Sequence, residues 1–132
     1  MDHIFTVREA RELLPAVKAR AEQVIAARAD LAELQADMRR GIRSPHGGLP
    51  EAKGLEARLS ELLTWFPEQG IDVKGFAPLL LDFPAMLGGV PVLLCWLEGE
   101  PQLAWYHRLE CGFAGRRIIP EEPPGPEGPG GP

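Results

Sequence analysis

The segment "FTVREARELLPAVKARAEQVIAARADLAELQADMRRG", residues 5–41, decides the fold because it predicts one long helix. Thr6 and Glu9 indicate its start, since hydroxyl and carboxylate can each accept a hydrogen bond from a free backbone N–H in a capping box. Apolar residues recur at alternating spacings of three and four, apart from the places held by Arg28 and Gln35, which predicts a seam that packs on a second helix. The seam comprises Val7, Ala10, Leu14, Val17, Ala21, Val24, Leu31 and Met38, flanked by Leu13, Ile25 and Leu34. Gly41 can end this helix, whose roughly 34 residues span about 50 Å.

A second helix is predicted over residues 50–66, after the connector "IRSPHGGL". Pro50 suits a first helical turn, and Pro67 with Gly70 indicates the end. The apolar face comprises Leu55, Leu59, Leu62, Leu63 and Phe66. Because this helix is about half as long as the first, an antiparallel hairpin covers only the second half of helix one. The first half therefore needs another partner.

Three later segments predict short strands: "IDVKGFAPLLLDFP" (71–84), "VPVLLCWL" (90–97) and "QLAWYHR" (102–108). "EGEP" (98–101) predicts a hairpin turn between the last two. The middle strand is apolar on both faces, which indicates that other parts of the protein pack on both sides of it. We therefore expect an α+β fold, in which a long antiparallel helical hairpin is followed by a small antiparallel β-meander packed on the first half of helix one.

Composition limits the domain organisation and the class of partner. The 132 residues suit one domain, expected over 1–119, followed by a disordered Pro/Gly/Glu tail at 120–132. Three of the five net negative charges lie in that tail, so the body is weakly acidic, which argues against nucleic-acid binding. No apolar run is long enough to cross a bilayer, and no membrane partner is expected. Two cysteines and no signal peptide predict a cytoplasmic protein.

Three stretches together resemble a bacterial family of unknown function, DUF2203. They are "FTVREARELLP", "VKGFAPLLLDFPA" and "VLLCWLEGEPQLAWYHRLECGFAGRR". The resemblance covers nearly the whole chain except the connector and the tail. It implies a helical hairpin followed by a small sheet. It implies no activity, so candidate sites must come from the chemistry of the residues.

A metal site is one candidate, although no CxxC or HExxH spacing supports it. Glu100 and His107 lie at opposite ends of a strand, roughly 20 Å apart, and cannot share an ion. In a meander, Asp82, His107, Glu110 and Cys111 are predicted to gather at one edge, where they could bind zinc or iron. Cys95 is interpreted instead as a small core residue. Asp82 could equally cap a turn, and His107 could anchor the corner by hydrogen bonds to the backbone.

Arginines near the end of the chain are the other candidates. Arg108, Arg116 and Arg117 could bind an anion or form ion pairs with acidic side chains of the fold, for which Glu9, Asp82 and Glu100 are available, or with those of a partner. Cys111 lies close to Arg108 and Arg116 in the sequence, which favours a reactive thiol.

Two functions remain open. The heptad seam and the lack of a catalytic motif favour a non-enzymatic interaction or scaffold module. The apolar stripe on helix one is wider than one neighbour needs, and the middle strand needs cover on its second face, so this module is expected to be a homodimer. The two copies could pair their hairpins into a four-helix bundle or dock their sheets. Alternatively, a bend at Pro15 lets helix one wrap the sheet and bury these surfaces within one chain. The alternative is a metal-binding protein or metal-dependent enzyme that uses the corner around Asp82 and His107.

Overall fold

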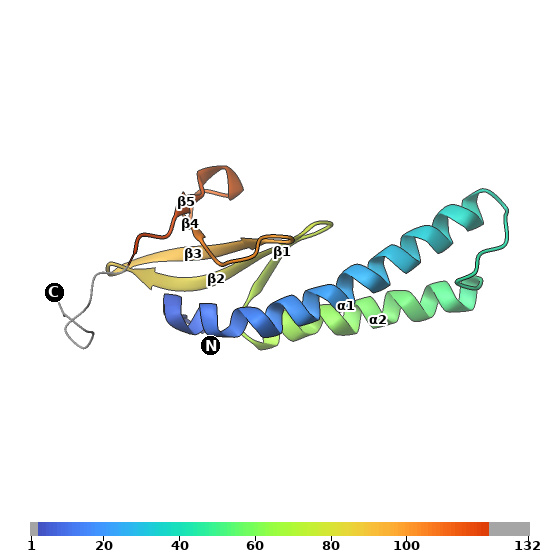
Figure 1. The fold of residues 1–132 in the computed structure, drawn as a ribbon, viewed down its shortest axis with the longest axis horizontal. Helices are drawn as coiled ribbons and strands as arrows, with labels where there is room; N and C mark the ends of the chain where they lie inside the picture. Colours follow the sequence, from blue (N-terminus) through green and yellow to red (C-terminus); the bar gives the residue numbers. More distant parts are fainter. Residues whose placement is uncertain (1–2, 122–132) are drawn as a thin grey trace.

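A computed structural model describes residues 3–121 of the chain. Figure 1 shows a long helical hairpin beside a small sheet, with the short 3-10 helix η1 (Phe113–Gly115) on the side of the sheet away from the helices. The predicted fold class is therefore confirmed. Most of the predicted tail, residues 122–132, lies outside the described residues.

Helix α1 spans Val7–Arg39 and begins with the predicted capping box. The Glu9 N–H donates to the Thr6 hydroxyl at 3.0 Å, and the Glu9 carboxylate accepts from the Thr6 N–H at 2.9 Å. At the other end, Gly41 has a φ of 69°, a left-handed conformation that glycine adopts without strain.

The predicted seam of α1 is correct in its first half and wrong near its end. Its first six residues, from Val7 to Val24, are buried. Farther along, Ala27 and Leu34 are buried instead of Leu31 and Met38, and Met38 is 42% exposed. A strict seven-residue repeat drifts around a straight helix with 3.6 residues per turn, so the buried stripe leaves the predicted positions.

Helix α2 spans Leu49–Glu68 and packs along the second half of α1 (Figure 1). It runs past Pro67, which the sequence predicted as its stop. The Gln69 N–H donates to the carbonyls of Trp65 and Phe66, so the helical hydrogen bonding continues after the residue that lacks an N–H.

The sheet is an antiparallel meander in the order β1-β2-β3-β4-β5. Its strands are Asp72–Phe76, Leu79–Leu87, Val90–Leu97, Trp105–Arg108 and Arg117–Ile118. The single strand predicted over 71–84 is wrong, because the chain reverses at Ala77 and Pro78 and forms two paired strands. Proline has no N–H for a ladder hydrogen bond, which suits it to that reversal. β4 is shorter than predicted, and β5 pairs with its outer edge.

One face of the sheet lies on the first half of α1 and forms the core. It carries the buried residues Leu79, Leu81, Phe83, Ala85, Val92, Leu94 and Trp96. Just before α1, the Phe5 N–H donates to the Pro84 carbonyl at 2.7 Å, which ties the start of the helix to β2. The alternate residues of the same strands point to the opposite face, called the outward face below.

Candidate metal centre

Three polar residues meet on the outward face of the sheet. Asp82 on β2 is the register partner of Cys95 on β3, and His107 on β4 pairs with Leu93, two residues from Cys95. Side chains two residues apart on a strand share a face, so this register places all three together. They are buried, with exposed fractions of 3%, 0% and 4%. One carboxylate oxygen, the Cys95 Sγ and one imidazole nitrogen all lie within 4.8 Å of one another.

The contacts of His107 show which of its two ring nitrogens carries a proton. Its Nδ1 lies 2.9 Å from the Arg108 carbonyl oxygen. A carbonyl oxygen only accepts, so Nδ1 carries the proton. The Nε2 atom faces the Asp82 Oδ1 at 3.3 Å. Two acceptors do not face each other in a buried site unless a proton or a cation lies between them.

Cys95 is a neutral thiol in this environment. Burial, followed by the nearby Asp82 carboxylate, raises the pKa of Cys95 to about 12, and the Arg116 guanidinium only partly opposes this. A fully buried thiol with a raised pKa is a poor nucleophile. The trio therefore does not suit covalent catalysis by Cys95, although a metal ion can displace the thiol proton.

Arg116 packs on the outward face beside this trio. Its guanidinium lies 5.0 Å from the centre of the Trp105 ring and 4.6 Å from that of Phe113. Its Nη2 donates to both carboxylate oxygens of Glu100, at 2.7 and 2.8 Å, and to the Cys95 carbonyl at 3.3 Å. Within residues 3–121, the Arg116 Nε is a buried polar side-chain atom with no hydrogen-bond partner.

The residues predicted for a metal site are only partly brought together. Asp82 and His107 meet, but Glu110 is largely exposed and pairs with Arg108. In the described part of the chain, neither Glu110 nor Cys111 joins a cluster of metal-binding side chains. Cys111 is half-buried and packs against Gly115. A Cβ added to Gly115 would lie 2.7 Å from the Cβ of Cys111.

Cys95 is the member of the trio that sequence reasoning missed. A strand apolar on both faces does not reveal which of its residues points which way. The missing signal was the register with β2, which puts Cys95 directly opposite Asp82. Of the predicted arginines, Arg116 and Arg108 form ion pairs with Glu100 and Glu110, while Arg117 is exposed on the edge strand β5.

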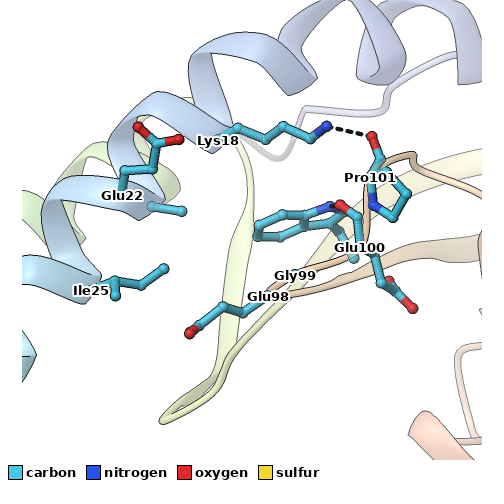
Figure 2. Close-up of a pocket in the computed structure, with 9 residues that line it drawn as sticks. Lys18, Glu22, Ile25, Glu98, Gly99, Glu100 and Pro101 are labelled. Carbon is cyan, nitrogen blue, oxygen red and sulfur yellow. Dashed lines mark hydrogen bonds between the residues drawn. The ribbon is translucent and has the colours of Figure 1, made fainter.

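A separate pocket of about 280 Å³ lies between α1 and the turn after β3 (Figure 2). The polar groups that line it are largely bound to the protein itself. Lys18 donates to the Pro101 carbonyl, and the Trp96 indole N–H donates to the Glu100 carbonyl at 2.9 Å. Glu98 forms a bidentate pair with Arg28, at 2.9 and 2.7 Å. These contacts fasten the turn to the helix and occupy most of the polar groups that line the pocket.

Comparisons with known proteins agree with the resemblance seen in the sequence. No curated protein and no solved structure matches the chain. None of the described helices is long and apolar enough to cross a membrane. The model of the family described as "Uncharacterized conserved protein (DUF2203)" matches residues 3–119. The chain, whose sheet carries the buried trio of Asp82, Cys95 and His107, thus belongs to the DUF2203 family.

Proposed function

We propose that this protein binds one transition-metal ion, zinc or ferrous iron, through Asp82, Cys95 and His107. The distance of 3.3 Å between the Asp82 Oδ1 and the His107 Nε2 carries the proposal. A direct bond between an imidazolium and a carboxylate is about 2.7–2.9 Å long. Two ligand atoms about 2.0–2.1 Å from one tetrahedral zinc ion are themselves about 3.3 Å apart. The distance between these two atoms therefore fits two ligands of one metal ion better than a direct hydrogen bond.

The remaining contacts support the same assignment. The bond from the His107 Nδ1 to the Arg108 carbonyl directs the Nε2 lone pair toward Asp82, as outer partners of metal-binding histidines do. Thiolate, imidazole and carboxylate together suit zinc or iron. All three ligand atoms lie within 4.8 Å of one another, against about 3.6 Å for sulfur and nitrogen on one zinc ion. A small shift of Cys95 toward the pair closes that difference.

Three protein ligands leave a fourth position for water or another small ligand, as in catalytic zinc sites. All three side chains are buried, so a large substrate cannot reach the ion. Burial therefore favours a structural role for the ion, or a role of the protein as a metal sensor, over catalysis on a large substrate. The proposed class is therefore a small metal-binding protein, with any catalysis limited to a small ligand.

Metal content is the decisive measurement. We expect protein purified without a histidine tag to contain about one zinc or iron per chain by elemental analysis. Cobalt(II) added to the metal-free protein should give a thiolate charge-transfer band in the near ultraviolet. Asp82→Asn, Cys95→Ser and His107→Gln should each lose stoichiometric metal, because removing a direct ligand should weaken binding by more than the roughly 10-fold to 100-fold that loss of an outer hydrogen-bond partner costs.

Matched controls lie nearby in the same chain. Cys111→Ser and Glu110→Gln make the same chemical changes at residues outside the trio and should keep the metal and the cobalt band. If the wild type folds fully with no bound metal and gives no cobalt–thiolate band, the trio is a buried ion pair and the proposal is wrong. Loss of the band in Cys111→Ser would move the site to the residues predicted from the sequence.

A second candidate function, self-association into a homodimer, has its own observation. On the outward side of the sheet, Phe113 and Ile118, the register partner of Trp105, are 46% and 66% exposed. We propose that two copies pair through this face, because pairing would remove these two apolar side chains from water. The interaction module would then enclose the metal site within its interface.

Light scattering tests the dimer. The wild type should give a species of twice the 14.5 kDa chain mass at micromolar concentration. Ile118→Lys should shift it to the monomer, because a lysine in an apolar interface remains unpaired. The control Leu49→Lys changes a similarly exposed residue at the far end of the hairpin and should remain dimeric. A wild-type monomer contradicts this proposal without affecting the metal proposal.

A further inference from the structure

The loop between the two helices forms the end of the molecule farthest from the sheet (Figure 1). We call residues 38–49 the hairpin tip. Its sequence, "MRRGIRSPHGGL", contains three arginines and one histidine and no carboxylate. Neither the metal site nor the outward face involves these residues.

Apolar side chains are exposed at the hairpin tip. Met38, Ile42 and Leu49 are 42%, 47% and 58% exposed. Scattered exposed apolar residues are normal on a protein surface. Here three of them fall within one short segment at the end of a long projection, which indicates a contact surface.

The arginines of the tip do not take part in ion pairs within residues 3–121. Arg39, Arg40 and Arg43 are exposed, and within residues 3–121 none of them forms a salt bridge or a side-chain hydrogen bond. One basic residue at a helix end is explained by the helix dipole, but Arg43 lies beyond the end of α1. The tip therefore presents three unneutralised guanidinium groups among apolar side chains.

Two of the nearby carboxylates, those of Glu33 and Glu51, accept hydrogen bonds from the loop itself. Glu33 accepts from the His46 Nε2 at 2.7 Å, and this bond raises the pKa of His46. Glu51 accepts from the Gly48 N–H at 2.8 Å, which lowers the pKa of Glu51. These contacts hold the connector on the two helices. Asp37 also lies beside the tip, but within residues 3–121 it forms no salt bridge with the three arginines.

We propose that the hairpin tip docks on an anionic lipid surface, with its arginines at the headgroups and Ile42 and Leu49 inserted between them. Amphipathic elements with basic and apolar side chains bind membrane interfaces in this way without spanning the bilayer. This inference departs from the expectation of no membrane partner, which rested on the lack of a spanning segment.

Charge distribution favours docking through the tip. The chain as a whole carries a net charge of -5, so most of its surface is repelled by an anionic membrane. A nucleic acid would also attract arginines, but the tip has no aromatic residue for base stacking, and exposed Ile42 and Leu49 add nothing to phosphate contacts. Lipid is therefore the surface that uses both kinds of side chain.

Co-sedimentation of the full chain with vesicles tests the proposal. We expect binding to vesicles containing phosphatidylglycerol at about millimolar lipid, and none to pure phosphatidylcholine. The triple variant Arg39→Gln, Arg40→Gln, Arg43→Gln should bind on the order of 100-fold more weakly, because each arginine near the surface contributes about fivefold. The double variant Ile42→Ser, Leu49→Ser should also bind more weakly while keeping its salt dependence.

The control removes the same charge elsewhere. Arg8→Gln, Arg58→Gln and Lys74→Gln change three exposed basic residues outside the tip and should leave vesicle binding unchanged. Circular dichroism melts of each variant verify that it is folded. The proposal is overturned if the wild type does not bind anionic vesicles at low salt, if the control weakens binding as much as the tip variant, or if the tip binds an oligonucleotide and not vesicles.

Discussion

On β2, Leu81 and Phe83 point toward α1, while Asp82 between them points to the opposite face of the sheet. All three side chains are buried. The helix-facing side is filled by apolar side chains from the sheet, α1 and α2. The outward face is filled by Asp82, Cys95 and His107, with the guanidinium of Arg116 packed between two aromatic rings beside them.

The difference shows two ways of burying one strand. On the helix-facing side, stability depends on the apolar area and volume that each side chain removes from water. On the outward face, it depends on whether each polar group keeps a partner, because an unsatisfied buried group costs free energy. Volume should therefore govern substitutions on the first side, and hydrogen bonding and charge should govern those on the second.

Phe83→Ala should give the largest effect. Phe83 is fully buried, and its loss leaves a cavity beside α1, so we expect the free energy of unfolding to fall by about 3–5 kcal/mol. Urea unfolding followed by circular dichroism measures this change. Met86→Ala on the same strand alters a side chain that is 46% exposed and should cost far less. Equal losses would show that volume does not control the helix-facing side.

His107→Ala should have an intermediate effect on the metal-free protein. It leaves the Asp82 carboxylate buried without its imidazole partner, so the free energy of unfolding should fall by about 1–3 kcal/mol. Excess zinc should raise the melting temperature of the wild type and not that of the variant. An unchanged stability in His107→Ala would break the comparison, because the outward face would then be functional without being structural.

Glu98→Gln should have the smallest effect, and it probes a polar contact at the margin of the helix-facing side. Glu98 accepts from Arg28 on α1 and from the Leu79 N–H, so its loss should cost about 1 kcal/mol at neutral pH. The hydrogen bond from Arg28 lowers the pKa of Glu98. Its stabilisation is therefore complete above the ordinary pKa of about 4.5 and disappears as the pH falls below that value.

Denaturation curves at several pH values measure this dependence. The wild type and Glu98→Gln should differ at pH 7 and converge in acid. A difference that persists at the lowest pH would mean that packing, and not charge, makes the contribution of Glu98.

Much of the fold could be predicted because its signals are local. Thr6 and Glu9 start α1 through bonds within one turn, and the spacing of Val7 to Val24 marks the buried stripe. The reversal at Pro78 was missed because the apolar residues on both sides of it read as one continuous strand. The late seam of α1 was missed because the prediction kept a strict seven-residue repeat, which drifts around a straight helix with 3.6 residues per turn.

For the candidate site, the sequence alone determined the residue types and the two members, Asp82 and His107, that strand order brings to one edge. Only the tertiary structure decided that Cys95 joins them and that Glu110 and Cys111 do not. The physical reason is register, since moving a strand by one residue turns every side chain to the other face. In β3 both faces are apolar, so no local pattern marks which face Cys95 occupies, and the pairing with β2 and β4 settles it.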